Sequence, residues 1–365
     1  MRILHVVGTR PNLVKMAPVV GALRERFGEW PTTVVHTGQH YDRMMFEIFL
    51  EELGMPEPSH VLGVGSGTHA EQIARVLERL EPVLAAERPD LVLVPGDVNS
   101  TLGAALCSAK LGFPVAHLES GLRSRDRGMP EETNRIATDH LSALCFLHCD
   151  EAFENLLAEG VDESRVKFVG NTMIDTLVAL EHRFREQAAA AALGVRPGGY
   201  LLVTLHRPAL VDGPLLGAAM DALSTAGREL PVVFPVHPRT RKMLDGAAYP
   251  GVTLTDPVGY LDFLSLEADA AAVLTDSGGI QEETTYLGVP CFTLRDNTER
   301  PVTIRAGTNL LLGLDPSRIR EIPELLGSRA SADRADPGGE GQPPTPPDLW
   351  DGRAADRVAD VLADW

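Results

Sequence analysis

Short runs of apolar, mostly β-branched residues alternate along the chain with longer amphipathic stretches. In the first half these runs cover residues 3–7, 32–36, 91–95, 114–118 and 166–170. Apolar residues recur between them with helical spacing, most clearly over residues 11–27 and 69–87. Alternation of this kind predicts βαβ units, in which helices cover both faces of a parallel sheet.

The same pattern starts again in the second half of the chain. Its apolar runs cover residues 200–206, 231–237, 252–256, 271–276 and 290–295. An alanine- and charge-rich stretch over residues 176–200 separates the two series and is expected to be a helix that ends at a domain junction. We therefore expect two doubly wound domains facing each other across a cleft, over residues 1–175 and 196–345. Ligands of such sheets bind beyond the carboxyl ends of the strands.

The last forty residues predict a loop followed by a helix. Residues 327–347 are rich in proline, glycine and charge, which is typical of a flexible loop. Residues 348–365 carry Trp350, Ala354, Val358 and Val361 at roughly helical spacing. We expect this terminal segment to fold back onto the body of the protein as a closing helix.

Composition narrows the classes of partner. A chain of 365 residues exceeds the usual size of a single core, so two domains are expected. Its net charge of −18 argues against nucleic acid or an anionic membrane as the main partner, although a local cluster of cations can still bind an anionic small molecule.

Cysteine usage and the N-terminus both favour the cytoplasm. The four cysteines are few for this length and are typical of a reducing compartment. The apolar stretch near the N-terminus spans about six residues, which is short for a signal peptide. Cys145, His148 and Cys149 lie close together, but no second cysteine pair follows at a zinc-like spacing, so core packing is favoured over a metal site.

Cations lie at the first strand-to-helix turn, in the segment VVGTRPNLVK (6–15). Arg10 and Lys15 flank a helix start at Pro11, a residue well suited to the first helical position. A helix N-terminus with two cations suits a pyrophosphate. The spacing matches neither GxGxxG nor GxxxxGK[ST], so surface charge is an equally good interpretation of these two residues.

Carboxylates follow two further strands of the first domain. Asp97 and Glu119 each come directly after an apolar run, and Glu131 and Glu132 follow, with Arg135 behind them. A single carboxylate at such a position more often caps a helix than performs catalysis. Several carboxylates at successive strand ends favour catalysis, because those ends meet at one edge of the sheet.

The second half supplies cations and a glycine turn. His206 and His237 each follow a strand, and either alone is more often packed or solvent-facing than catalytic. Ser277, Gly278 and Gly279 join a strand to a helix, where either a plain cap or an anion site fits. The loop over residues 294–303 carries Arg295, Glu299 and Arg300, and a salt-bridged loop is its alternative interpretation.

Ten motifs occur in order along the chain and together resemble one family. They are GTRPNLVKMAP (8–18), TGQHYD (37–42), PGDVNST (95–101), HLESGLRS (117–124), MPEETNR (129–135), VGNTMIDTL (169–177), TLHRP (204–208), FPVHPRTR (234–241), LTDSGGIQEET (274–284) and LRDNTERPVT (294–303). The chain is similar over residues 1–325 and its terminal helix to the non-hydrolysing UDP-N-acetylglucosamine 2-epimerases. The resemblance implies two Rossmann-like domains in a GT-B-like fold.

The same resemblance implies the chemistry and the roles of residues. UDP-GlcNAc and UDP-ManNAc would interconvert through elimination of UDP to 2-acetamidoglucal and re-addition, with no cofactor and no metal. The N-terminal domain would carry the catalytic carboxylates, the C-terminal domain would bind UDP, and a homodimer is expected. The catalytic set implied is Asp97, Glu119, Glu131, Lys15 and His206. The UDP-sugar ligands expected are Arg10, Arg135, His237, Phe263, Ser277, Gly278, Gly279, Glu283 and Arg300, with Glu283 at the ribose and Phe263 at the uracil.

Departures from the family pattern keep alternatives open. In HRPALVD, Ala209 and Leu210 stand where the family usually has polar residues, and Ser120 stands where alanine is usual. A modified UDP-hexosamine is therefore an alternative substrate, and allosteric activation by UDP-GlcNAc is in doubt. A hydrolysing epimerase, a GT-B glycosyltransferase and a non-catalytic nucleotide-sugar-binding regulator are the other functions considered. The last would be favoured had the carboxylates at 97, 119 or 131 been lost.

Overall fold

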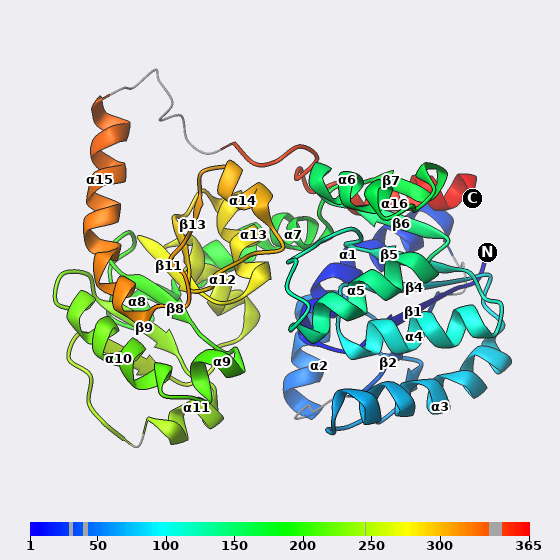
Figure 1. Ribbon diagram of the computed structural model, residues 1–365, viewed down its shortest axis with the longest axis horizontal. Helices are drawn as coiled ribbons and strands as arrows, with labels where there is room; N and C mark the ends of the chain where they lie inside the picture. The colour runs from blue at the N-terminus through cyan, green and yellow to red at the C-terminus, as the bar shows by residue number, and fades with distance from the viewer. Residues whose placement is uncertain (29–31, 39–42, 245, 336–344) are drawn as a thin grey trace. The chain divides into compact units, whose positions relative to one another are not determined.

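The computed structural model describes residues 1–28, 32–38, 43–244, 246–335 and 345–365 (Figure 1). The chain divides into two compact units: unit 1 is Met1–Ala179 with Asp348–Trp365, and unit 2 is Leu180–Pro347. Residues 39–42 of the TGQHYD motif lie outside the described residues. No helix in the described ranges is long and apolar enough to cross a membrane.

Unit 1 is built on a parallel sheet of seven described strands in the order β3-β2-β1-β4-β5-β6-β7. The strands are β1 (Ile3–Val7), β2 (Thr32–His36), β3 (His60–Val61), β4 (Leu91–Pro95), β5 (Val115–Leu118), β6 (Leu144–Leu147) and β7 (Val166–Phe168). His5 of β1 pairs in register with Val34 of β2 on one side and with Leu93 of β4 on the other. The strand order therefore reverses between β1 and β4, which is where doubly wound sheets bind ligands.

Helices cover this sheet, and their ends follow from local chemistry. They are α1 (Arg10–Phe27), α2 (Arg43–Glu52), α3 (His69–Glu87), α4 (Asn99–Lys110), α5 (Pro130–Leu141), α6 (Asp150–Ala158), the short 3₁₀ turn η1 (Glu163–Arg165), α7 (Thr172–Glu186) and α16 (Ala354–Asp364). α3 packs along α4, and α4 along α5 (Figure 1). α3 begins at a capping box in which Glu71 N donates to Thr68 Oγ1 (3.3 Å) and Thr68 N donates to Glu71 Oε2 (2.9 Å). Its buried face, Val76, Leu80 and Leu84, joins the core of β1 and β4.

The terminal helix α16 packs on α1 of unit 1. Trp350, which precedes it, is 2% exposed, and its indole donates to the carbonyl of His148 (2.7 Å). The carboxylate of Asp175 on α7 accepts hydrogen bonds from the first two residues of α16, Ala354 N (3.1 Å) and Ala355 N (2.6 Å). The C-terminal segment is thus joined both to α7 and to the residue that follows β6, which are distant from it in sequence.

Unit 2 repeats the architecture with six described strands in the order β10-β9-β8-β11-β12-β13, all parallel. They are β8 (Leu201–Thr204), β9 (Val232–Pro235), β10 (Val252–Thr255), β11 (Ala272–Thr275), β12 (Cys291–Thr293) and β13 (Asn309–Leu311). Its helices are α8 (Ala189–Ala192), α9 (Pro208–Val211), α10 (Leu215–Ala226), α11 (Pro238–Met243), α12 (Tyr260–Ala268), α13 (Gly278–Leu287), α14 (Pro301–Arg305), η2 (Pro316–Glu321) and α15 (Ile322–Ala335). The reversal of strand order lies between β8 and β11, and a core cluster of buried apolar residues joins β8, α10 and η2.

The predicted doubly wound domains are confirmed, and the ten predicted strands are present with small changes at their ends. Three short strands, β3, β6 and β13, were not predicted. β6 lies in the apolar run that contains Cys145, which is fully buried, as core packing requires. The cleft expected between the domains stays a prediction.

Two predictions of local structure are wrong. Residues 176–200 do not form one helix, because Ala188 adopts a left-handed backbone (φ 48°) between α7 and α8. The predicted loop over 327–347 is wrong for residues 327–335, which continue α15, whereas 336–344 lie outside the described residues. Composition favoured disorder there, but Ser328 Oγ donates to the Glu324 carbonyl one turn earlier in α15 (3.0 Å).

Candidate active site

The turn after β1 is held against the turn after β4 by Asn12. Its side-chain oxygen accepts from Gly8 N (3.2 Å), and its amide donates to the Pro95 carbonyl (3.1 Å). A Cβ atom at Gly8 would lie 2.3 Å from Ser100 Oγ, so only glycine fits this close approach. One buried asparagine thus fixes the two strand ends that flank the point of reversal in unit 1.

Arg10 and Lys15 lie on α1 beside these turns. Arg10 is half-buried at the first position of the helix, with its guanidinium carbon 5.6 Å from the centre of the Phe49 ring. Lys15 is 8% exposed and forms an ion pair with Glu119. A Cβ atom at Gly96 would lie 3.3 Å from Lys15 Nζ, so the ammonium sits directly beside the turn that carries Asp97.

Asp97 is partnered by α5. Arg135 Nε donates to Asp97 Oδ2 (3.1 Å), and Asn134 donates to the Asp97 carbonyl (2.9 Å). The Asp97 side chain remains 22% exposed, whereas Arg135 is 1% exposed and also pairs with Glu132. In the structure Arg135 is therefore a buried partner of Asp97, and the contact expected between it and the substrate stays a prediction.

The neighbouring glutamates of α5 have different surroundings. Glu132 is 2% exposed and accepts from Ser124 N, Ser124 Oγ and Arg125 N, each at 2.9 Å. Burial alone would raise the pKa of Glu132, but the hydrogen bonds from Ser124 and the charge of Arg135 outweigh it and lower that pKa. Glu131 is half-buried, and its side chain has no hydrogen bond or ion pair within the described part of the chain. Glu132 therefore holds a loop, and Glu131 is the member of the pair open to chemistry.

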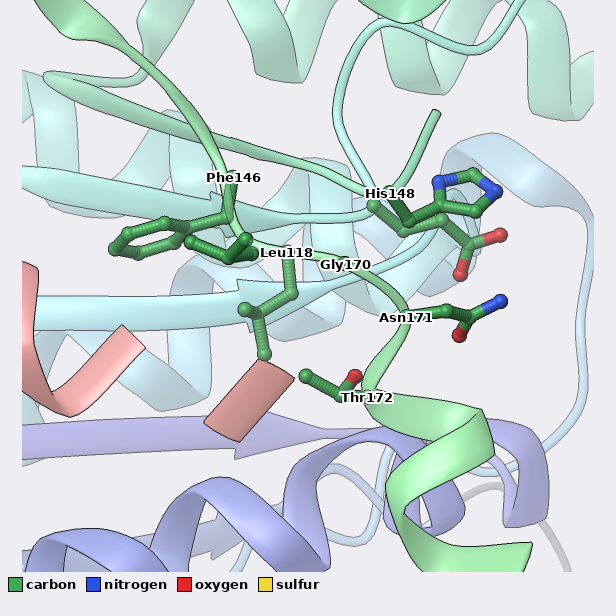
Figure 2. A pocket seen from close by; sticks show the side chains of 8 residues that line it. Leu118, Phe146, His148, Gly170, Asn171 and Thr172 are labelled. Carbon is green, nitrogen blue, oxygen red and sulfur yellow. The ribbon is translucent and has the colours of Figure 1, made fainter. Parts of the chain in front are cut away.

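Glu119 adopts a left-handed backbone (φ 66°), which is unusual for a residue with a side chain. Such a conformation costs about 1–3 kcal/mol and persists only where the surroundings enforce it. A small pocket with room for about one water lies beside it, lined by Leu118, Glu119, Phe146, His148, Val169, Gly170, Asn171 and Thr172. Figure 2 shows the His148 ring and the Asn171 amide on one side of this pocket and Leu118 and Phe146 on the other. The lining comes from the ends of β5, β6 and β7.

In unit 2 the corresponding strand ends are tied together by Asp276. This fully buried carboxylate accepts from His206 N (2.9 Å) and Arg207 N (2.8 Å), and its other oxygen lies 2.9 Å from His206 Nδ1. Burial would raise the pKa of Asp276, but the contacts with His206 and Arg207 lower it. The His206 side chain is 57% exposed, so its ring is held at the end of β8 while open to solvent.

The glycine turn begins α13, with Ser277 as its cap residue. A Cβ atom at Gly278 would lie 2.3 Å from Arg300 Nη1, so the guanidinium packs directly against the glycine. Arg300 is 5% exposed, and its side chain forms ion pairs with Glu282 (3.1 Å) and Glu299 (3.4 Å). The amides of the first helical turn have no partner within the helix and favour an anion. A buried cation behind them adds to that preference.

Three arginines gather on Glu299. Its carboxylate lies 2.7 Å from Arg295, 3.4 Å from Arg300 and 3.7 Å from Arg207. Burial lowers the pKa of Arg295, which the charge of Glu299 only partly offsets. The three cations face the carboxylates of Glu282 and Glu299, and the Asp276 carboxylate, which accepts from Arg207 N, lies directly before the glycine turn. The salt-bridged loop considered as an alternative is present, and it lies behind the candidate anion site.

The remaining candidates of unit 2 lie on α11, α12 and α13. Glu283 is 4% exposed and accepts from Tyr260 Oη (3.0 Å), while Phe263 is half-buried against a smaller core cluster. His237 is exposed at the start of α11 and Gly279 is half-buried in the first turn of α13. Leu210 is 1% exposed and belongs to the unit 2 core, so this departure from the family pattern is buried apolar surface.

Several residues at these sites were not found from the sequence. They are Asn12, Asn134 and His148, which position or line the turns of unit 1. Asn12 and Asn134 both stand in the quoted motifs, but an amide that bonds to a distant carbonyl leaves no spacing signal. Only the structure shows which strand ends they join.

Two doubly wound domains, each with cations and a helix N-terminus where its strand order reverses, define a class of α/β proteins that hold anionic nucleotide ligands. Comparison with known proteins makes the class specific. The family model described as UDP-N-acetylglucosamine 2-epimerase matches residues 23–363. The chain therefore belongs to the UDP-N-acetylglucosamine 2-epimerase family.

Individual relatives agree with this membership. A Methanocaldococcus jannaschii protein named UDP-N-acetylglucosamine 2-epimerase is 41% identical over 341 residues, which covers 89% of this chain and 92% of that protein. A Pseudomonas aeruginosa protein named UDP-2,3-diacetamido-2,3-dideoxy-D-glucuronate 2-epimerase is 39% identical over 370 residues, covering 100% and 99%. The crystal structure of the M. jannaschii UDP-GlcNAc 2-epimerase with UDP-GlcNAc and UDP superposes with a TM-score of 0.85 at 36% identity, covering 100% of both chains. The predicted GT-B-like fold is confirmed by this likeness.

Proposed function

We propose that this protein is a non-hydrolysing UDP-GlcNAc 2-epimerase that interconverts UDP-GlcNAc and UDP-ManNAc. The observation that carries the proposal is the pair of carboxylates at the ends of β4 and β5, Asp97 and Glu119, each in direct contact with a cation. Glu131, in the first turn of α5, is the third carboxylate of unit 1 in the proposal. Glu119 has a strained backbone and pairs with the buried Lys15. Nucleotide binding alone does not require such an arrangement, so it favours a catalytic protein over a non-catalytic binding protein. A glycosyltransferase needs one base and an acceptor groove rather than this group of acids.

Unit 2 would hold the UDP part of the substrate. The amides at the start of α13 and the exposed His206 ring would bind the diphosphate, with the arginine cluster on Glu299 behind them. Negative charge grows on UDP as it departs, and donors that are already in place stabilise it without reorganisation. Glu283 would hold the ribose and Phe263 the uracil, while Arg10, His237 and Gly279 would make further contacts to the nucleotide sugar.

Unit 1 would move the protons. One carboxylate takes the C2 proton while the C1–O bond to UDP breaks, and the electrons of the C–H bond form the C1–C2 double bond of 2-acetamidoglucal. UDP then adds back to C1, and a proton is delivered to the opposite face of C2. The two faces need two groups, and Asp97, Glu119 and Glu131 supply the candidates for general base and general acid.

A modified UDP-hexosamine is the second candidate substrate. The P. aeruginosa relative, whose name specifies a diacetamido glucuronate, is 39% identical over the whole chain. Leu210, four residues after His206 in the sequence, also replaces a polar residue of the usual motif with a buried apolar one. We further propose that the protein acts in the cytoplasm as a homodimer, in keeping with the reduced state of its four buried cysteines.

Proton NMR in D₂O tests this function. Incubation with UDP-GlcNAc is expected to give UDP-ManNAc carrying deuterium at C2, and an Asp97→Asn variant serves as the inactive control. Product without deuterium, or free ManNAc as the only product, would exclude the non-hydrolysing mechanism. A parallel incubation with UDP-2,3-diacetamido-2,3-dideoxy-D-glucuronate decides between the two substrates.

A further inference from the structure

A buried charged network lies directly beneath the turns of Asp97 and Glu119. Its centre is Asp139 on α5, which is fully buried. One oxygen lies 2.7 Å from His117 Nδ1, and the other accepts from Gly121 N (3.1 Å) and from Arg123 Nη1 (2.8 Å). Arg123 also pairs with Glu159 (2.6 Å) at the edge of the network.

His117 extends the network to the neighbouring strand end. Its ring is fully buried, and Nε2 lies 2.7 Å from the carbonyl oxygen of Gly96, the residue before Asp97. A carbonyl can only accept, so Nε2 must donate to it. The carboxylate of Asp139 can likewise only accept while ionised, so Nδ1 must donate as well. An imidazole that donates from both nitrogens is a cation.

The charges of the network are consistent with this protonation. His117 and Arg123 supply two positive charges, and Asp139 and Glu159 supply two negative ones. Burial alone would raise the pKa of Asp139, but the contacts with His117 and Arg123 lower it, which keeps the carboxylate ionised. A balanced set of this kind can remain in the interior, whereas removing one member leaves an uncompensated buried charge.

We propose that Asp139, acting through His117, is a positioning residue for catalysis that fixes the Asp97 turn relative to the Glu119 turn. The proposal rests on the proposed function. Asp139 holds Gly121 N, two residues after Glu119, and through His117 it holds the carbonyl directly before Asp97. One oxygen of this carboxylate thus holds the Glu119 turn directly, and the other holds the Asp97 turn through His117. The strained backbone of Glu119 lies between His117 and Gly121, at the point where that restraint acts.

The effect belongs to the chemical step, because UDP would be bound by unit 2. A displacement of about 1 Å in a catalytic group costs about 10²-fold in rate. We therefore expect Asp139→Asn to lower kcat about 10- to 100-fold while KM for UDP-GlcNAc and the affinity for UDP stay within about twofold. A residue that serves only the fold would instead lower the amount of folded protein and leave kcat per folded molecule unchanged.

The experiment compares Asp139→Asn with the wild type and with Glu163→Gln, an exposed acid on the same unit as a matched control. Steady-state kinetics and the rate of C2 deuterium incorporation are measured on the full chain, and calorimetric UDP binding gives the fraction of competent protein. Parallel losses of kcat and of exchange at unchanged UDP affinity support positioning. An unchanged kcat, or a rise in KM alone, overturns it.

Two further measurements keep the test decisive. If Asp139→Asn does not fold, His117→Gln carries the same kinetic test, since its amide can still donate to Gly96 while Asp139 keeps Arg123. NMR of ¹⁵N-labelled histidine in the wild type is expected to show both His117 nitrogens protonated at neutral pH, and a neutral ring overturns the network as described. Wild type that epimerises no UDP-hexosamine removes the proposed function and this proposal together, whereas an active wild type with an unaffected variant removes only the positioning role.

Discussion

Replacing Asp175 by asparagine should change how the stability of unit 1 depends on pH. The carboxylate is 5% exposed and accepts from the first two amides of α16, so it joins α7 to the terminal helix. Burial raises the pKa of Asp175 to about 6, because the two backbone hydrogen bonds offset it only in part and Asp351 and Asp356 add like charge. An asparagine is nearly the same shape and does not ionise.

The magnitude follows from linkage between protonation and folding. A group whose folded pKa is raised contributes stability that is fully present below its unfolded pKa and is lost as pH rises through the folded value. For Asp175 that window runs from 3.8 to about 6. Each pKa unit corresponds to about 1.4 kcal/mol, so the wild type loses about 3 kcal/mol across the window that the variant keeps. Asparagine loses one of the two backbone hydrogen bonds, which costs about 1 kcal/mol at every pH.

We therefore expect Asp175→Asn to be about 1 kcal/mol less stable than the wild type near pH 4 and about 2 kcal/mol more stable near pH 7. Urea unfolding followed by tryptophan fluorescence measures this, since the three tryptophans, at positions 30, 350 and 365, all belong to unit 1. The matched control is Glu163→Gln, an exposed acid of the same unit. Wild-type and Asp175→Asn stabilities that run parallel from pH 4 to pH 7 would refute the reasoning.

Three more substitutions test the two sites. Asp97→Asn and Glu131→Gln should each slow epimerisation and C2 exchange about 10²- to 10⁴-fold with UDP affinity unchanged, and a parallel loss of UDP binding by calorimetry would contradict the assignment to proton transfer. Gly278→Ala puts a Cβ atom 2.3 Å from Arg300 and should weaken UDP binding, with a tenfold rise in Kd for each ~1.4 kcal/mol of binding free energy lost. In the control Gly217→Ala the new Cβ atom meets nothing within 4 Å, so UDP binding should stay unchanged. Glu267 is fully buried, neither carboxylate oxygen has a hydrogen-bond partner among the described residues, and burial with the charge of Glu283 raises its pKa well above 4.5. Its stability contribution is thus lost as pH rises above 4.5, so Glu267→Met should be about 1–3 kcal/mol more stable at pH 7, with a gain that shrinks toward pH 4.5 in urea unfolding followed by circular dichroism.

The sequence predicted the main strands and helices of each domain, because these elements depend on local periodicity. Helix α3 and strand β4 follow from apolar spacing and a capping box, which act within a few residues of chain. Short elements carry less signal: β3 has two residues and β13 three, too few for a pattern to repeat. The break at Ala188 and the continuation of α15 depend on backbone conformations that composition does not specify.

Candidate residues were harder to assign than candidate segments. The motifs located every turn that the structure places at a reversal of strand order, and Lys15 and Glu119 are in contact there. What the motifs could not show is which member of a pair is buried. Glu131 and Glu132 are adjacent, yet one is half-buried and the other holds Ser124 and Arg135. Arg300 was expected as a ligand and lies behind the glycine turn, 5% exposed, with its charge directed at Glu282 and Glu299.

Two aspartates that follow equivalent strands in the two domains differ in how deeply their side chains are buried. Asp97 follows β4 and Asp276 follows β11, and each of these strands is paired with the first strand of its sheet. Asp276 has no exposed surface: one oxygen accepts from the backbone amides of His206 and Arg207, and the other lies against the His206 ring. Asp276 is therefore a structural link between β8 and β11. Asp97 keeps 22% of its side chain exposed, and in unit 1 it is Asn12 that joins the ends of β1 and β4. A carboxylate at a strand end can thus be a buried structural link, as Asp276 is, or keep exposed surface, as Asp97 does, and the two domains of this chain contain one of each.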